Sequence, residues 1–427
     1  MNAPSAAGAR QPSVTAALNT RIAFLLELAR RLHQYGTSAP RLEMAIDLSA
    51  RRLGLQADVW SSPTAIIISF SDLGQGDEGV AQTTQVMRLA PGDINLARLC
   101  EADAIADRVI AGELDLREGF RLLRALGAPD TRKAKINTIA SYGLSAASIA
   151  ALFLHSSWVD LVVAAVIGML IGAITLLAST RPRLAAASDA ISAVVATAVA
   201  VLVSAFVVPL AIKSVVLAAL IILVPGMSLT TAVREVSSGH LVSGMARLGG
   251  AMATLLKLVF GTVAATEVCA AFGIHARDFA LPPLPGWTDW PALLVAAVAF
   301  AMLFRAARRD WPAVIVAVMV GYLATRWGGE FSGRLPSAPF GVFVGGLLVS
   351  ALANLYARVA KRPGAVIREP GILLLVPGSV GFRSVSFLLE RDTTLGMDTA
   401  LLLLTLLVSL VGGLLFGELL VSPRRSL

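Results

Sequence analysis

Charged residues are scarce in this chain: Asp, Glu, Lys and Arg make up 15% of its 427 residues, while hydrophobic residues make up 56%. In a typical soluble domain about a quarter of the residues are charged, so this composition excludes an ordinary soluble protein and predicts a membrane protein. The charge is also uneven, because residues 1–135 hold 16 basic and 15 acidic residues, whereas the longer stretch 136–427 holds 20 and 13. We therefore expect a soluble N-terminal domain followed by a membrane domain.

Cysteine and histidine are nearly absent. The two cysteines, Cys100 and Cys269, fall in different predicted domains, which excludes a disulfide framework. The four histidines are scattered without the spacing of a metal site, so no metal and no cofactor is predicted. No Walker A sequence occurs, which disfavours ATP-driven work by this chain. The net charge of +8 fits basic loops beside a lipid bilayer better than nucleic-acid binding, so no nucleic-acid partner is expected.

The first 135 residues divide into a polar lead-in and a compact segment. Residues 1–20 lack the apolar core of a signal peptide and are expected to be disordered. Residues 21–135 predict two amphipathic helices, the second with Ser38 as its N-cap, then three strands and two more helices near 93–111 and 115–126. We predict a small cytoplasmic α+β domain. It offers no recognisable nucleophile–base pair, so a regulatory or assembly role is favoured over hydrolysis.

Apolar segments long enough to cross a bilayer fill the rest of the chain. Ten spans are predicted: 136–155, 158–178, 190–208, 211–229, 246–272, 291–306, 311–326, 338–357, 368–386 and 398–420. If these ten spans cross the membrane in turn, 16 basic residues lie on the same side of the membrane as the N-terminal domain and 6 lie on the opposite side. Basic loops face the cytoplasm, so we expect a multi-pass protein of the cell (inner) membrane with both termini cytoplasmic.

Two of these spans contain the same interrupted run. Residues 220–226 read LIILVPG and residues 372–378 read ILLLVPG, with the two prolines 152 residues apart. Each run lies in the fourth span of a set of five, and an odd number of spans inverts the second set. We therefore predict two inverted five-helix repeats, 136–272 and 291–420. The alternative is chance similarity between Leu-rich helices in which proline is a tolerated kink.

The Pro-Gly breaks indicate where a substrate could bind. Proline removes a backbone donor and glycine lets the chain open, so freed backbone groups must face protein or a water-filled cavity. Hydroxyl groups follow each break, and a half-helix N-terminus suits a carboxylate. We predict a cradle for a small zwitterion formed by Pro225, Gly226, Ser228, Thr231, Pro377, Gly378 and Ser379.

Few other polar groups lie within the spans. Lys257 and Glu267 share the fifth span but are ten residues apart, about 15 Å along a helix, so they cannot pair. Because buried charges in membranes are costly and often functional, we expect Lys257 and Asn354 to contact substrate and Glu267 to carry the coupling proton. Alternatively, Lys257 snorkels to the interface and Glu267 lies in a hydrated vestibule.

With these motifs the chain resembles the threonine/serine exporter family. The likeness covers nearly the whole chain: the stretch ARRLHQYGTSAPRLEMAIDLSARRLGL, the strands after it, and ten spans in two halves that each bear LVPG. It implies export of threonine and serine driven by the proton gradient, and the family's motif falls on Pro225, Gly226, Pro377 and Gly378. Split relatives resemble dicarboxylate exporters, so a small organic acid is the alternative substrate.

Two other classes of function stay open at this stage. A membrane-anchored hydrolase would use the N-terminal domain on peptides, and a passive channel would not accumulate its solute. The leading hypothesis is a secondary exporter and no enzyme, with a small molecule and the lipid bilayer as its partners. A homo-oligomer is possible but nothing in the sequence requires one.

Overall fold

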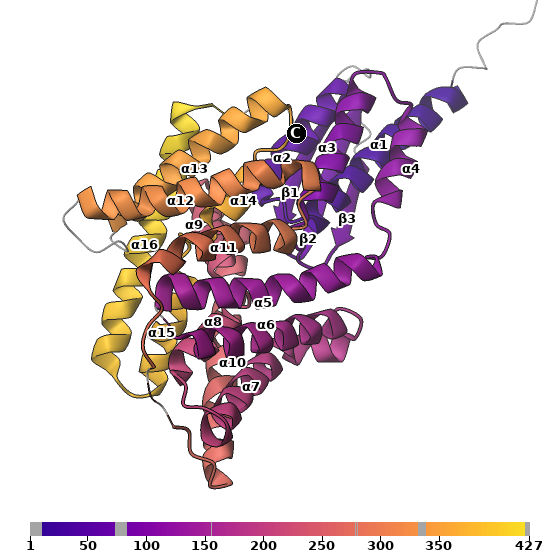
Figure 1. Ribbon diagram of the computed structural model, residues 1–427. Helices are drawn as coiled ribbons and strands as arrows, with labels where there is room; N and C mark the ends of the chain where they lie inside the picture. The colour runs from indigo at the N-terminus through magenta and orange to yellow at the C-terminus, as the bar shows by residue number, and fades with distance from the viewer. Residues whose placement is uncertain are drawn as a thin grey trace, which may run out of the picture.

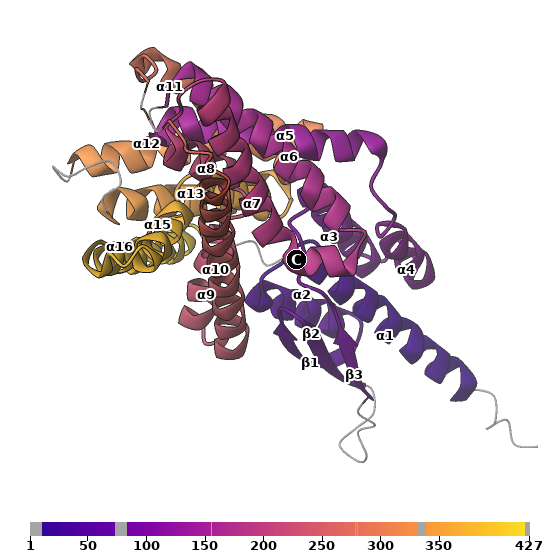
Figure 2. The same ribbon diagram turned by 90° about the horizontal axis from the view of Figure 1, so that it is seen from below.

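The computed structural model describes residues 11–72, 83–154, 156–277, 279, 281–331 and 339–422. Its N-terminal elements gather on one side of the long helices that follow (Figures 1 and 2). They have the order that the sequence predicts: α1 (Gln11–Gln34), α2 (Ala39–Arg52), β1 (Leu55–Ser62), β2 (Ala65–Asp72), β3 (Thr83–Arg88), α3 (Leu96–Ile110) and α4 (Leu116–Ala125). One boundary differs, because α1 begins at Gln11 inside the expected lead-in of 1–20. Pro12 does not prevent this, since the first turn of a helix needs no proline N–H.

The three strands form one antiparallel sheet in the order β1-β2-β3. The central strand alternates, and Ile66, Ile68 and Phe70 are buried on one face. This face belongs to the same apolar core as Phe24 of α1 and Ile46 of α2. The apolar residues on one face of the strand therefore pack against the apolar stripes of the helices in one core.

Within the described residues, eight helices are long and apolar enough to cross a membrane. The protein is thus a mostly helical, multi-pass membrane protein. These helices are α5 (Arg132–Leu154), α6 (Trp158–Ala178), α7 (Pro182–Phe206), α10 (Leu241–Ala271), α11 (Asp289–Leu303), α12 (Trp311–Phe331), α13 (Pro339–Ala360) and α16 (Thr393–Leu420), where α11 and α12 are each extended at the start by a 3-10 turn, η1 (Gly286–Thr288) and η2 (Arg308–Asp310). Among these long helices, α7 differs most from its predicted start: it begins at Pro182, eight residues before the predicted span of 190–208. Pro182 and the residues after it form the first turns of the helix.

The two predicted spans that contain Pro-Gly are each built as two short helices. The span predicted at 211–229 consists of α8 (Ile212–Leu220) and α9 (Gly226–Ser237), and the one predicted at 368–386 consists of α14 (Ala365–Ile372) and α15 (Gly378–Leu389). Proline cannot continue the hydrogen-bond ladder, so the first helix of each pair ends a few residues before it. All four short helices bury residues against their neighbours.

The long helices pack in corresponding pairs on the two sides of the breaks. Helix α7 packs on α10 and α13 packs on α16, while α5 and α11 pack on each other. Contacts also cross between the two sets, because α10 packs on α15 and α16 packs on α9. The short helices that follow the breaks therefore each pack mainly on the last long helix of their own set and also touch that of the other set.

The N-terminal region is joined to the long helices by backbone hydrogen bonds. At the start of α3, Leu96 N donates to Phe304 O at 2.9 Å and Ala97 N donates to Arg305 O at 3.2 Å. Arg305 has φ +52°, the left-handed conformation common just after a helix end, and it closes α11. Its guanidinium also lies 2.7 Å from Asp130. The core of the N-terminal region continues into α11 without interruption.

Candidate functional site

The two Pro-Gly breaks have the same backbone geometry. Pro225 has φ −79° and ψ 43°, and Pro377 has φ −81° and ψ 40°. In each break the glycine N donates back to the valine two residues earlier, at 2.7 Å for Gly226 and 2.9 Å for Gly378. The backbone hydrogen bonds just before the breaks also correspond, 152 residues apart: Leu223 N donates to Leu220 O and Leu375 N donates to Ile372 O, both at 2.8 Å.

The two breaks touch each other. A methyl group on Gly226 would lie 3.1 Å from Gly378 Cα, and one on Gly378 would lie 3.1 Å from Gly226 Cα. The same methyl groups would overlap the side chains of Val376 and Val224 respectively. Only glycine lets two backbones approach this closely, which explains the residue that follows each proline.

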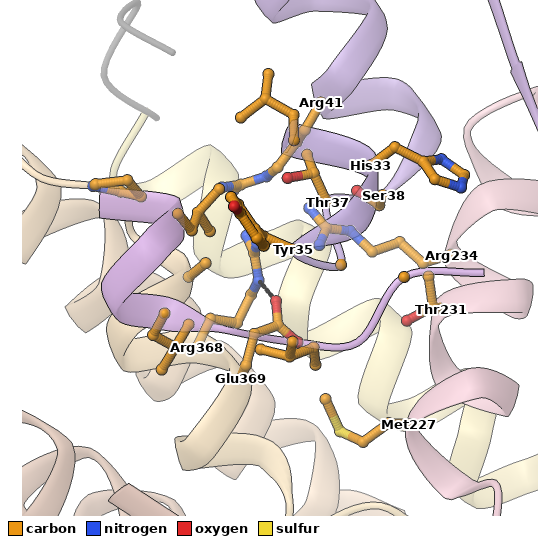
Figure 3. A pocket seen from close by; sticks show the side chains of 18 of the residues that line it. His33, Tyr35, Thr37, Ser38, Arg41, Met227, Thr231, Arg234, Arg368 and Glu369 are labelled. Atoms are coloured by element: carbon orange, nitrogen blue, oxygen red, sulfur yellow. Dashed lines mark hydrogen bonds and ion pairs between the residues drawn. The ribbon is translucent and has the colours of Figure 1, made fainter. Parts of the chain in front are cut away.

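A cavity of about 160 Å³ begins just beyond the first break. Several parts of the chain line it, and three of them carry most of the polar groups labelled in Figure 3: the segment between α1 and α2 with the first turn of α2, helix α9 as far as Arg234, and α14. We call it the vestibule. The residues used below are Thr37 and Arg41 from the N-terminal region, Ser228, Thr231 and Arg234 from α9, and Arg368 and Glu369 from α14.

Three arginines converge on one carboxylate beside the vestibule. Glu418 of α16 is paired with Arg234, and its Oε1 lies 3.5 Å from Arg41 Nη2 and 3.6 Å from Arg368 Nη1. Arg368 Nε donates to Glu369 at 3.2 Å. Burial, together with the neighbouring guanidiniums of Arg368 and Arg234, holds the pKa of the Arg41 guanidinium well below its usual value. The like charges therefore crowd one another, and the two carboxylates compensate them only in part.

A carboxylate of α9 fixes the N-terminal region against this site. Glu235 is fully buried and accepts hydrogen bonds from Arg247 Nε at 2.9 Å, from Ser243 Oγ at 2.8 Å and from Ala39 N at 3.1 Å. Ser38 occupies the N-cap position of α2 as the sequence predicts, but its side chain makes no capping bond. Glu235 supplies the acceptor in its place, because it reaches a first-turn N–H that would otherwise be buried and unsatisfied.

The structure brings together only some of the predicted substrate residues. Ser228 and Thr231 line the vestibule, whereas Pro225, Gly226, Pro377, Gly378 and Ser379 are not in its wall. Asn354 is buried and lines a second cavity, of about 190 Å³, together with Arg41 and Glu418. Its Nδ2 donates to Val421 O at 2.7 Å, so it also ties α13 to the end of α16.

The two predicted charges of α10 lie elsewhere. Lys257 Nζ lies 3.5 Å from Asp189 of α7 and donates to Ala186 O at 3.2 Å. Glu267 is exposed on α10, and no ion pair is found for it within the described ranges. Neither residue lines the vestibule or the second cavity.

The sequence analysis did not predict the arginine cluster, because it used basic residues only to orient the spans. One signal could have found it. Each broken segment carries an Arg-Glu pair, 234–235 after the first break and 368–369 before the second. In an inverted repeat these two positions fall on the same side of the membrane.

The donor set does not suggest a metal centre. Among the residues that the structure describes, no group of three or more His, Cys, Asp or Glu side chains could hold a metal ion. The vestibule instead offers guanidinium, carboxylate and hydroxyl groups, which suit a small polar molecule.

Comparison with known families identifies both halves of the chain. The family model ThrE, of threonine/serine exporters, matches residues 23–269. A second model, described as "Threonine/Serine exporter, ThrE", matches residues 291–420. The first match alone covers more than half of the chain and includes the N-terminal elements as well as α5 to α10.

Curated relatives are fungal membrane proteins named pheromone-regulated membrane protein 10. That of Eremothecium gossypii is 24% identical over 370 residues, which is 84% of this chain and 48% of the relative. That of Saccharomyces cerevisiae is 23% identical over 391 residues, 88% of this chain and 50% of the relative. The chain thus spans about half the length of these relatives. No solved structure matches it.

Proposed function

This chain belongs to the threonine/serine exporter family, and on that premise we propose that it is a secondary active exporter of threonine and serine driven by the proton gradient. Family membership points to a transporter rather than an enzyme. The observation that carries the proposal is the contact between Gly226 and Gly378 with a cavity directly beyond it. Paired broken helices beside a cavity are the usual substrate site of secondary transporters.

We further propose that residues 136–272 and 291–420 are inverted repeats, each broken pair counting as one of ten spans. The backbone bonds that recur at an offset of 152 residues support this, as do the exchanged contacts of α9 with α16 and of α15 with α10. The N-terminal region, 21–135, would then be cytoplasmic, and the protein would lie in the inner membrane with both termini inside. A homo-oligomer is compatible with this arrangement.

The proposed mechanism is alternating access at the breaks. Residues 225–231 and 377–379 form the cradle: backbone groups freed by the prolines and the hydroxyls of Ser228, Thr231 and Ser379 bind the polar atoms of the substrate. The backbones of Gly226 and Gly378 close the path in this state. The path opens to the other side when the two sets of helices rock apart. Glu267 is our candidate for the group that carries the proton, since it is the carboxylate of α10 without an ion pair in the described chain.

A small organic acid is the second candidate substrate. The observation that favours it is the excess of positive charge beside the vestibule, where three arginines face Glu418 and Glu369. An organic acid carries net negative charge that would offset this excess, whereas a zwitterion has no net charge.

Counterflow in proteoliposomes tests the proposal. Radiolabelled threonine should enter vesicles preloaded with threonine or serine, and accumulation above the outside concentration would exclude a passive channel. Radiolabelled succinate and vesicles preloaded with succinate test the second candidate in the same way. If neither amino acid is exchanged while succinate is, the substrate proposal is wrong and the organic acid replaces it.

A further inference from the structure

We infer that the vestibule contains a binding site for a carboxylate group, formed by Arg368 with Arg234 and Arg41. The inference rests on the proposed function, because it assigns this site to the carboxylate of the substrate before the substrate reaches the breaks. It names a loading site that adjoins the predicted cradle and shares Ser228 and Thr231 with it, and to which the N-terminal region contributes Arg41 and Thr37.

The first observation is an unsatisfied donor. Arg368 is only 3% exposed, and within the described part of the chain its Nη1 has no hydrogen-bond partner. Glu418 Oε1 is 3.6 Å away, close enough for attraction but too far for a hydrogen bond. Buried donors are nearly always paired, so an unpaired one in a cavity wall is a group that a bound molecule could satisfy. A carboxylate oxygen is the acceptor that matches a guanidinium best.

The second observation is the charge around that donor. Arg41, Arg234 and Arg368 carry three positive charges, while Glu369 and Glu418 carry two negative ones. Arg247, which also lines the vestibule, is already neutralised by Glu235. Within this cluster the positive charges outnumber the negative ones by one, while the other carboxylate of the wall, Asp103, lies on α3. A single bound carboxylate would balance the cluster.

The third observation is a hydroxyl group across the vestibule. Thr37 Oγ1 is buried and, in the described chain, also lacks a hydrogen-bond partner. Thr37 precedes α2 and Arg368 lies on α14, so the two unused groups come from different walls (Figure 3). A ligand that reaches both needs a carboxylate at one end and a second polar group at the other.

The size of the vestibule limits what this ligand can be. Its volume of about 160 Å³ is roughly ten times what a single water molecule needs. This is room for one small metabolite. Hydroxy amino acids and small dicarboxylates both satisfy these limits, and they share the carboxylate that the arginines would bind. Because Ser228 and Thr231 line the same cavity, a molecule held here lies next to the first break.

Binding to the purified full-length protein in nanodiscs tests the site. Isothermal titration would compare threonine, threoninamide (which lacks the negative charge) and succinate on the wild type and on Arg368→Gln, Arg368→Lys and Arg41→Gln. Arg383→Gln is the matched control, because Arg383 is exposed on α15 outside both cavities and its loss removes the same charge. Size-exclusion profiles show which variants are folded. The Lys and Arg41 variants keep the test valid if Arg368→Gln does not fold.

We expect Arg368→Gln to weaken carboxylate binding by about 10- to 100-fold, the range for losing a charged hydrogen bond. Arg41→Gln should weaken it less, and Arg368→Lys should fall between the wild type and Arg368→Gln. The wild type should prefer threonine to threoninamide, and this preference should vanish in Arg368→Gln. Arg383→Gln should bind like the wild type. The relative affinities for threonine and succinate identify the source of the carboxylate.

Three results separate this site from the proposed function. Unchanged binding in every arginine variant, with threonine counterflow intact, overturns the site and leaves the exporter standing. Arginine-dependent binding without any counterflow supports the site and overturns the exporter. Failure of the wild type to bind threonine, serine and succinate overturns the site whatever the transport assay gives.

Discussion

Gly226 and Gly378 lie in backbone contact although 152 residues separate them, each as the first residue of the helix that follows a Pro-Gly break. The contact is reciprocal, since each glycine also faces the valine two residues before the other. It joins the two halves of the membrane domain through the glycine backbones, with one valine side chain from each half beside them.

Gly226→Ala should impair both packing and transport. The added methyl group would overlap Val376 and press on Gly378, and overpacking of this kind costs about 1–3 kcal/mol. Threonine counterflow should be strongly reduced and the melting temperature in detergent lowered. The control is Gly249→Ala on α10, where the new methyl group meets nothing within 4 Å. There alanine should be neutral or slightly stabilising. Equal counterflow in both variants would contradict a role for the contact.

Glu235→Gln should loosen the N-terminal region. It leaves Arg247 without its buried partner and weakens the acceptor for Ala39 N, at a cost of about 3 kcal/mol. Amide hydrogen exchange in the first turn of α2 should become faster, and the protein should melt earlier. Glu390→Gln is the control, because its pair with Lys213 is exposed and contributes less than about 1 kcal/mol. Unchanged exchange in α2 would show that the cap is not needed.

Acidification should destabilise the protein through His33. Burial lowers the pKa of His33 from 6.5, and its Nε2 hydrogen-bonds Ala90 O at 3.1 Å. As pH falls through 6.5, the unfolded chain takes up this proton before the folded one, so stability is lost from there down to the folded pKa and then levels off. Melting temperatures at about pH 7.5 and pH 5.5 should differ less for His33→Gln than for the wild type. An identical pH dependence in both would rule His33 out.

Glu267→Gln tests the proton-coupling proposal. The amide cannot release a proton, so efflux driven by a pH gradient should fall to the rate without a gradient, while counterflow, which needs no net proton movement, should persist. Asp398→Asn serves as the control, because Asp398 is also exposed, on the last long helix. Full gradient-driven efflux by Glu267→Gln would remove the assignment.

Lys257→Gln separates substrate contact from a structural role. The lysine pairs with Asp189 at 3.5 Å, and its side chain is 42% exposed, so losing the pair should cost less than about 1 kcal/mol. The geometry therefore predicts nearly unchanged melting and unchanged threonine affinity. A large loss of affinity with normal melting would restore the prediction from sequence that Lys257 contacts substrate.

Local patterns in the sequence predicted most of the elements. Hydropathy predicted the eight long helices, and the repeated LVPG predicted both breaks, because proline and glycine act on their own segment. The N-terminal helices and strands followed from periods of 3.6 and 2. Helix starts were less accurate, since α1 and α7 both begin before the apolar pattern does.

The vestibule could not be predicted in the same way. Its charges come from Arg41, Arg234, Arg368 and Glu418, which no periodicity relates to one another. In the sequence Arg234, Arg368 and Glu418 stand near span ends, where a basic residue usually means only a cytoplasmic loop, and Arg41 lies in the N-terminal region far from any span. The capping of α2 by Glu235 was hidden for the same reason, because Ser38 satisfied the local rule and the true acceptor lies 196 residues away.

The hydrogen bonds from Leu96 and Ala97 to the end of α11 have a mechanical consequence. The first N–H groups of α3 donate to carbonyl groups at the end of α11 that have no partner within that helix. The two helices, although distant in sequence, are therefore joined end to end. If α11 tilts during a transport cycle, α3 should move with it, because separating the two helices would break these hydrogen bonds and leave the backbone groups of both ends unpaired. A fluorophore pair across the N-terminal region could therefore report each turnover from the aqueous side.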